Sequence, residues 1–229
     1  MKLSIIIPTY NEERTIQRII EKINALNISI EKEIIVIDDG SNDKTWKILS
    51  EFATQQDIKL VRHPKNLGKG AAVRTGLRKA TGNLAIIQDA DLEYDPQEIL
   101  KLLPQMNTKI SAVYGQRSTE IWPKRGYHYV LGAQIMTKII NFLYASRLKD
   151  IYTGYKLFNL DILRESFAKL KSSGFEFEAE VTCEILNKKG IIVETPINYT
   201  PRSKEEGKKI KFKDAVFGFF MILRCFLKN

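Results

Sequence analysis

The chain has 229 residues, enough for one large domain or for a domain with a small appendage. Its hydrophobic content of 44% and charged content of 28% are ordinary for a globular protein, but 36 Lys and Arg residues against 27 Asp and Glu residues give a net charge of +9. This excess predicts an anionic partner and, taken alone, allows a nucleic acid, a nucleotide sugar or an anionic membrane surface.

Cysteines and apolar segments narrow the class of protein. Cys183 and Cys225 lie far apart in the sequence and predict neither a zinc site nor a disulfide framework, so we expect both to be reduced in a cytosolic protein. The apolar stretch at the N-terminus stops at Pro8, too early for the hydrophobic region of a secretion signal. No apolar window reaches the roughly 20 residues that cross a bilayer, so we expect a protein that does not span a membrane by itself.

Strand and helix patterns alternate in the first half of the chain. Short continuous apolar runs predict strands, whereas apolar residues three and four apart predict helices. Strands are expected at residues 3–7, 33–37, 58–62, 84–87 and 110–114, and helices at residues 12–25, 44–53, 71–80 and 99–106. This alternation, with continuous apolar strands, is typical of a parallel sheet that helices cover on both faces. We therefore predict an α/β fold.

The second half is predicted to be mainly helical. Helices are expected at residues 127–148, 181–186 and 214–227, with a short strand at residues 191–193. No repeat or low-complexity linker interrupts the chain, which favours one domain over residues 1–213 and a C-terminal helix in residues 214–229. That last segment is apolar nearly all round and flanked by Lys and Arg, a pattern that suits either a membrane surface or a packing surface.

An acidic cluster directly follows the fourth expected strand. Asp89, Asp91, Glu93 and Asp95 would lie at the carboxyl edge of the sheet, where open α/β folds bind ligands. Asp89 and Asp91 are two residues apart, so in an extended chain they point the same way and suit one hard divalent cation, with coordination left for a substrate phosphate. A helix cap or turn is the alternative; it explains Asp95, which precedes Pro96, but not the other two aspartates.

The other three strand ends in this half carry polar or glycine-rich segments as well. They read Pro8-Thr9-Tyr10-Asn11-Glu12, Asp38-Asp39-Gly40-Ser41 and Asn66-Leu67-Gly68-Lys69-Gly70. Each alone could be only a turn or a helix cap, but together they predict one cleft at one sheet edge. A GxGxxG sequence is missing after the first strand, and Gly68-Lys69-Gly70 lacks the Walker pattern. Phosphate binding is therefore expected to use a metal, assisted by cationic side chains.

The candidate cations follow the fifth strand and lie near the end of the chain. They are Arg117, Lys124, Arg125, Arg202 and Lys208. Lys208 stands next to Lys209, and the residues alone favour a solvated run of charge for this pair over a phosphate contact. The two histidines, His63 and His128, are expected to be structural.

The four strand-end motifs, in this order, resemble those of glycosyltransferase family 2, and within it the polyprenyl-phosphate sugar transferases of the dolichyl-phosphate mannose synthase and glucosyltransferase type. The resemblance continues through residues 150–158, 177–182 and 196–199, then Arg202 and residues 206–209, and covers essentially the whole chain. It implies a GT-A type, Rossmann-like fold: a mostly parallel sheet with helices on both faces and an amphipathic C-terminal helix.

The resemblance also implies roles for individual residues. The nucleoside would be held by Pro8, Tyr10, Glu12, Ile37 and Asp39, with Asp39 facing the base. Asp89 and Asp91 would bind Mg²⁺ or Mn²⁺ at the diphosphate, Ala90 would line the same pocket, and Glu93 could be a third metal ligand. Arg117, Arg202 and Lys208 would contact the diphosphate or an acceptor phosphate. Asp91 and Arg117 would be the catalytic residues.

The implied reaction is the inverting, metal-dependent transfer of a hexose from a nucleotide sugar, of the GDP-mannose or UDP-glucose type, to a polyprenyl or dolichyl phosphate. An ionised lipid phosphate needs no strong base, whereas a hydroxyl acceptor would need one, for which Glu178 and Glu180 are candidates. Two alternatives stay open: a soluble transferase acting on a sugar hydroxyl, and a non-catalytic nucleotide-binding scaffold.

The expected partners follow from this reaction. They are the nucleotide sugar, the lipid phosphate, and a membrane surface or membrane protein, with no nucleic acid. The expected location is the cytoplasmic face of a membrane. The sequence leaves the donor base, the sugar and the oligomeric state open.

Overall fold

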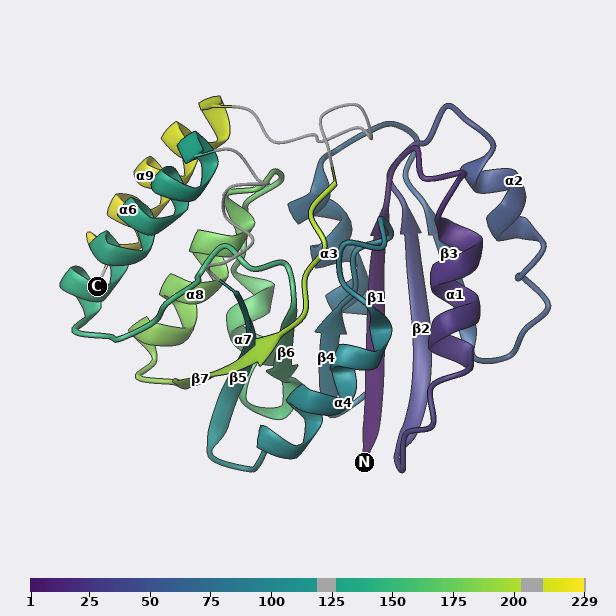
Figure 1. Ribbon diagram of the computed structural model, residues 1–229, viewed down its shortest axis with the longest axis horizontal. Helices are drawn as coiled ribbons and strands as arrows, with labels where there is room; N and C mark the ends of the chain where they lie inside the picture. The colour runs from purple at the N-terminus through teal and green to yellow at the C-terminus, as the bar shows by residue number, and fades with distance from the viewer. Residues whose placement is uncertain (119–126, 203–211, 229) are drawn as a thin grey trace.

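A computed structural model describes residues 1–118, 127–202 and 212–228 (Figure 1). The first half contains β1 (Lys2–Thr9), α1 (Ile16–Asn24), β2 (Glu31–Asp38), α2 (Thr45–Ser50), β3 (Ile58–Arg62), α3 (Lys69–Lys79), β4 (Leu84–Ile87), η1 (Pro96–Glu98), α4 (Ile99–Leu102), η2 (Leu103–Gln105) and β5 (Ile110–Arg117). The second half contains α6 (Tyr127–Tyr144), β6 (Lys156–Asn159), α7 (Leu160–Ala168), α8 (Phe177–Asn187), β7 (Ile191–Ile197) and α9 (Phe212–Phe226).

The strands described form one mixed sheet in the order β3-β2-β1-β4-β6-β5-β7. β1 pairs in parallel with β2 and β4, β2 with β3, and β5 with β7. β6 is antiparallel to both of its neighbours, β4 and β5. The predicted α/β fold with a mostly parallel sheet is therefore confirmed.

Helices cover both faces of the sheet, as its strand sequences require (Figure 1). Side chains alternate along a strand, so in β1 Ile5 and Ile7 belong to the core cluster that includes residues of α1, α2 and α4, whereas Ile6 belongs to the cluster that includes residues of α3, α7 and α8. Both sets are fully buried. Because the two faces are covered, ligand chemistry is left to the edge where the parallel strands end.

Two elements of the second half were not expected from the sequence. β6 spans only four residues, and α7 follows it at once, with Asn159 capping the helix through bonds from the amides of Asp161 and Ile162. β6 lies in the middle of the sheet and completes it between β4 and β5. Its insertion carries the preceding residues, 150–155, to the same edge as the acidic cluster that follows β4.

Helices α6 and α9 form an outer layer on α8, away from the sheet (Figure 1). Ile140, Cys183, Ile222 and Cys225 are buried together between these helices, and both cysteines are free thiols. The described helices include none long and apolar enough to cross a membrane.

Candidate metal and nucleotide site

The loops after β1 and β2 are tied together at the carboxyl edge of the sheet. The Asn11 amide donates to Ser41 Oγ at 2.9 Å, and the Asn42 amide donates to Asn11 Oδ1 at 2.9 Å. Asn11 has a φ of 52°, a left-handed conformation that asparagine adopts more readily than most residues. Farther along, the Glu12 amide donates to Thr45 Oγ1 at 2.9 Å. The segment from Tyr10 to Glu12 is thus fixed against the start of α2.

Asp39 ties the loop before α3 to the same edge. Its Oδ1 accepts from the Leu67 amide at 3.0 Å, and its Oδ2 accepts from the Gly68 amide at 2.8 Å. His63 Nδ1 lies 2.7 Å from Oδ1, and His63 Nε2 lies 3.0 Å from Thr75 Oγ1. Asp39 is 2% exposed. In this structure it ties the loops after β2 and β3 together, and its expected contact with a base stays a prediction.

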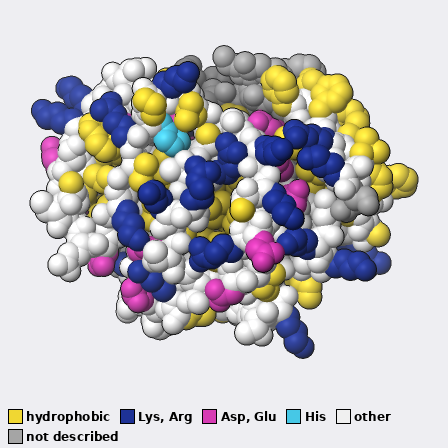
Figure 2. Space-filling view, turned by 180° about the vertical axis from the view of Figure 1, so that it is seen from behind, with side chains coloured by type: hydrophobic (Ala, Val, Ile, Leu, Met, Phe, Trp, Pro, Cys, Tyr) yellow, Lys and Arg dark blue, Asp and Glu magenta, His cyan; other side chains and the backbone are white. Residues whose placement is uncertain are grey.

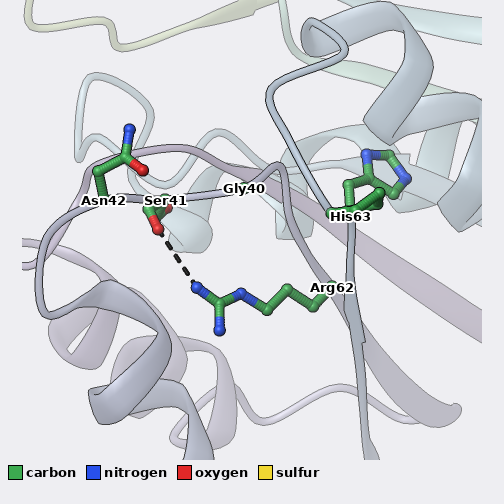
Figure 3. A pocket seen from close by; sticks show the side chains of 6 residues that line it. Gly40, Ser41, Asn42, Arg62 and His63 are labelled. Atoms are coloured by element: carbon green, nitrogen blue, oxygen red, sulfur yellow. Dashed lines mark hydrogen bonds between the residues drawn. The ribbon is translucent and has the colours of Figure 1, made fainter.

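A shallow pocket opens between the loops after β2 and β3 (Figure 3). It is lined by Gly40, Ser41, Asn42, Arg62, His63 and Pro64. The Arg62 guanidinium reaches from β3 toward the first loop, donating to the Ser41 carbonyl at 3.3 Å (Figure 3), and it also lies 3.1 Å from Asp38 Oδ2. The pocket places polar side chains and a cation next to the loops expected to hold a nucleoside.

Asp89 and Asp91 lie at the end of β4, each paired with a cation. Lys69 Nζ lies 2.8 Å from Asp89 Oδ1 and 3.0 Å from its Oδ2. The Arg202 Nη2 group donates to Asp91 Oδ2 at 2.9 Å. Burial raises the pKa of Asp89, and burial together with the charges of Asp89 and Glu93 raises the pKa of Asp91 to about 7. Like charges crowded in a desolvated site are the arrangement that a divalent cation would relieve.

Arg202 joins the two halves of the chain across this site. Besides Asp91, its guanidinium contacts both carboxylate oxygens of Glu12, at 3.1 and 3.2 Å. Burial lowers the pKa of Arg202, but the neighbouring charges of Asp91, Glu12 and Glu93 outweigh it and raise the pKa. A residue near the C-terminal end thus closes the site formed by β1 and β4.

Glu93, expected as a possible third metal ligand, has both oxygens engaged by the segment after β7. Its Oε2 accepts from the Tyr199 hydroxyl at 2.6 Å, and its Oε1 accepts from the Arg202 amide at 2.8 Å. Within the described ranges, no three His, Cys, Asp or Glu side chains come together as a metal site. The three-ligand set is not assembled here; Glu93 anchors the segment that carries Arg202.

Arg117 lies in an interior ion pair. Its Nε and Nη2 donate to the two oxygens of Asp150 at 2.6 and 2.7 Å, its Nη1 donates to the Tyr94 hydroxyl at 3.4 Å, and it lies over the Tyr199 ring. Although burial opposes its charge, Asp150 holds the pKa of Arg117 well above its ordinary value. Arg117 is 6% exposed, so its described geometry fixes the 150–155 segment and presents no open face to a phosphate.

The two candidate bases are also committed within the fold. Glu180 accepts from the amides of Lys171 and Ser172 at 2.8 to 3.0 Å. Glu178 accepts from the buried Lys156 ammonium and lies 3.5 Å from that of Lys69. Both carboxylates thus have partners within the fold, and the role of either as a base stays a prediction.

Residues 4–167 match the Glycosyl transferase family 2 model. The chain belongs to this family. It is 30% identical over 213 residues to a dolichol-phosphate mannosyltransferase of Pyrococcus furiosus, with 91% of this chain and 59% of that protein covered. It is 31% identical over 209 residues to the low-salt glycan biosynthesis hexosyltransferase Agl6 of Haloferax volcanii, with 89% and 49% covered. The chain thus spans about half to three fifths of these two curated relatives.

The fold agrees with a solved enzyme at much lower identity. Glucosyl-3-phosphoglycerate synthase of Mycobacterium tuberculosis, crystallised with Mn²⁺, uridine diphosphate and phosphoglyceric acid, superposes with a TM-score of 0.74 at 18% identity. The match covers 98% of this chain and 78% of that one. At this identity the comparison establishes the GT-A-like α/β fold.

Other family 2 positions expected in the site differ in accessibility. Tyr10 and Pro8 are half-buried at the end of β1. Ile37 and Ala90 are buried in the two core clusters on opposite faces of the sheet, so their side chains pack in the core near the strand ends. Lys124, Arg125 and Lys208 lie outside the described residues.

Three residues of this family 2 site were not assigned a role from the sequence. They are Lys69, Tyr94 and Gly154. Tyr94 stacks on Tyr155 and accepts from the Gly154 amide at 3.0 Å, which holds the 150–155 segment over Asp89. Lys69 was visible within Gly68-Lys69-Gly70, but the sequence did not show which acid it faces.

Proposed function

We propose that this family 2 protein transfers a hexose from a nucleotide sugar to a polyprenyl phosphate, with a divalent metal held by Asp89 and Asp91. One observation carries the proposal: these two carboxylates follow the end of β4, with Lys69 at the start of α3 against Asp89 and Arg202 linking Asp91 to Glu12 after β1. Carboxylate oxygens are the ligands that Mg²⁺ and Mn²⁺ prefer, and the raised pKa values of both groups indicate charge that a cation would stabilise.

The residues of the chain divide the work of displacement between them. Bound metal would supply charge stabilisation to the departing diphosphate. We expect the Arg202 guanidinium, which now contacts Asp91 and Glu12, to pair with the diphosphate as charge develops there. Asp39 and Asn11 hold the loops that would surround the nucleoside. The bond between the anomeric carbon and the diphosphate oxygen breaks, and a new bond forms between the anomeric carbon and an oxygen of the acceptor. The nucleoside diphosphate leaves.

The hydrogen bonds of the two candidate bases, Glu178 and Glu180, support a phosphate acceptor. A lipid phosphate is ionised at neutral pH and attacks without giving up a proton, whereas a hydroxyl must lose one. Glu178 is flanked by two lysines and Glu180 accepts from two backbone amides, so both carboxylates are already engaged within the fold, which supports an acceptor that needs no base. The name of the Pyrococcus relative, a dolichol-phosphate mannosyltransferase, agrees with this choice.

The outer helices offer a surface for the membrane that would hold such an acceptor. Leu131, Ile135 and Phe142 on α6 and Phe217 and Phe220 on α9 are 45 to 87% exposed. Figure 2 shows hydrophobic side chains gathered along the edge of the molecule where α6 and α9 lie, beside a face rich in Lys and Arg. Apolar side chains next to basic ones are typical of binding to an anionic bilayer surface, here proposed to be its cytoplasmic face.

The reaction is tested by incubating the protein with GDP-mannose or UDP-glucose, Mn²⁺ and a polyprenyl phosphate, and measuring released GDP or UDP. Asp91→Asn should abolish release. Asp95→Asn is the matched control, because Asp95 belongs to the same acidic cluster but caps η1 through the Gln97 amide. Release with a sugar acceptor but not with lipid phosphate would favour the hydroxyl-acceptor transferase; no release with any donor by folded protein would favour a non-catalytic scaffold.

Membrane binding is tested separately, by cosedimentation with vesicles containing anionic phospholipid. Phe142→Ser on α6 should weaken binding severalfold, because the side chain is 87% exposed. Leu100→Ser, on α4 and 39% exposed, is the control and should bind as the unaltered protein does. Equal binding of both variants would contradict the proposed surface.

A further inference from the structure

Lys69 contacts Asp89, the first of the two carboxylates that we propose as metal ligands and call the metal pair. Lys69 Nζ is 2.8 and 3.0 Å from the two oxygens of Asp89, and its side chain is only 18% exposed. Lys69 opens α3 just after Gly68, which has a φ of 98° and approaches Ser173 so closely that a Cβ would lie 2.3 Å from its carbonyl oxygen. The backbone therefore holds Lys69 in place whichever acid its side chain contacts.

A second carboxylate stands ready for the same ammonium. Glu178 Oε1 lies 3.5 Å from Lys69 Nζ, while Lys156 bonds the other oxygen of Glu178. Among the described residues, Glu178 Oε1 is a buried oxygen that accepts no hydrogen bond. A buried polar atom without a bond calls for an explanation. A shift of Nζ by roughly 0.5 Å would turn this contact into a hydrogen bond.

Arg202 is arranged in the same way at the second acid. It contacts Asp91 at 2.9 Å and has Glu12 as its other carboxylate, at 3.1 and 3.2 Å. Each acid of the proposed metal pair thus has one cation, and each of these cations has a second carboxylate outside the pair.

We propose that Lys69 is a resident counter-cation of the site with two positions: it neutralises Asp89, and it turns to Glu178 when a metal–nucleotide complex takes Asp89. The inference rests on the proposed function, since it assumes that Asp89 receives the metal. A metal ion arriving alone must displace Lys69 and Arg202 and gains little in exchange. A metal ion arriving with a nucleoside diphosphate also brings anionic oxygens, which compensate the displaced cations. Metal and nucleotide therefore bind as a coupled pair.

The test measures Mn²⁺ binding from the electron paramagnetic resonance signal of free Mn²⁺, with no donor sugar and no turnover. Lys69→Met should bind Mn²⁺ alone roughly tenfold more tightly than the unaltered protein, a change of about 1.4 kcal/mol. Adding GDP or UDP should tighten Mn²⁺ binding strongly in the unaltered protein and by a smaller factor in the variant. Lys69→Arg retains a cation and should resemble the unaltered protein.

Lys59→Met is the matched control for the loss of one positive charge. Lys59 also pairs with a buried carboxylate, Glu33 at 2.7 Å, but on β3 and away from Asp89. It should leave Mn²⁺ binding unchanged. Thermal unfolding with and without Mn²⁺ confirms that each variant is folded, and Mn²⁺ should raise the midpoint of Lys69→Met the most.

The results separate this inference from the proposed function. Mn²⁺ binding to Lys69→Met that is no tighter than to the unaltered protein overturns the role of Lys69. An unaltered protein that binds the nucleoside diphosphate but binds Mn²⁺ alone as tightly as with it overturns that role too. If Lys69→Met tightens Mn²⁺ binding but no nucleoside diphosphate binds any form of the protein, the result supports Lys69 as a counter-cation of Asp89 and contradicts the proposed nucleotide-sugar function.

Discussion

Gly154 lies so close to Asp89 that adding one methyl group, in Gly154→Ala, tests whether Asp89 is a metal ligand. A Cβ at position 154 would lie 2.6 Å from Asp89 Oδ2, 3.1 Å from Lys69 Nζ and 3.4 Å from a ring carbon of Tyr94. Ordinary contacts of this kind are about 3.4 Å or longer, so the Asp89 carboxylate must move by roughly 0.8 Å. The side-chain end of Asp89 can yield, whereas the backbone of residue 154 is held by the Tyr94 hydroxyl.

Gly154→Ala should therefore leave the fold intact and displace one metal ligand. A misplacement of about 1 Å in a functional group can cost on the order of a hundredfold. We expect nucleotide-dependent Mn²⁺ binding to weaken by about ten- to a hundredfold, and donor turnover to fall at least as much. The thermal midpoint should change by only a few degrees, because the overlap is with the end of a side chain.

Mn²⁺ and nucleotide titration by calorimetry, beside thermal unfolding, provides the assay. Gly132→Ala is the control: it lies in α6, and a Cβ there would meet nothing within 4 Å. That variant should bind normally and be stabilised by up to about 1 kcal/mol, the usual gain for alanine over glycine in a helix. Normal metal and nucleotide binding by folded Gly154→Ala would refute the placement of the metal at Asp89.

Three further predictions concern the charges around the site and the fold. Arg117→Met should destabilise the protein by about 3 kcal/mol in urea unfolding, because it leaves the partly buried Asp150 without the Arg117 cation. The double variant with Asp150→Asn should recover part of this loss of stability. Unchanged stability with a large fall in turnover would instead support the catalytic role inferred from the resemblance. Glu180→Gln should cost about 1 to 3 kcal/mol of stability, since its oxygens accept from backbone amides, and should leave the KM for donor unchanged; a selective fall in kcat would revive it as a base. Burial acts to raise the pKa of Glu33, but hydrogen bonds from Lys59 and neighbouring groups outweigh it and lower the pKa from 4.5 to about 2. The folded pKa lies below the unfolded one, so this stabilisation is present above about pH 4.5 and is lost as the pH falls toward 2. Glu33→Gln should therefore be less stable by on the order of 2 kcal/mol at pH 7, with a flatter stability profile between pH 4.5 and 2 in urea unfolding; a profile as steep as that of the unaltered protein would contradict the assignment.

The ends of β2 and β4 were predictable because each follows a continuous apolar run. Ile34 to Ile37 and Leu84 to Ile87 are buried on both faces, and such strands leave a clear signal in the sequence. The predicted alternation placed four loops at one edge, and the structure confirms that these loops are bonded to one another. β6 gave no such signal, because four residues, one of them the buried Lys156, do not differ from a loop in their local pattern.

The partners of the charged residues could not be predicted in the same way. Arg117 was visible as a cation at a strand end, but its partner, Asp150, follows 33 residues later and reaches it only through β6. Glu93 was visible as a carboxylate two residues past Asp91, but the segment that bonds it follows β7, about 106 residues later for Tyr199. Tertiary pairing, which decides whether an ion is open to a ligand, has no local pattern in the sequence.

The same pairing explains how a strongly cationic protein can keep an acidic site in a defined geometry. Asp89 and Asp91 would repel each other and rearrange if they were not compensated, and their pKa values are raised even with Lys69 and Arg202 in place. The two cations hold the acids apart from other partners and in the orientation that the loops define. The two cations also make binding selective, because a ligand must bring positive charge for the two acids and negative charge for the two cations. A metal–diphosphate complex meets both conditions, whereas a free metal ion or a free phosphate meets only one.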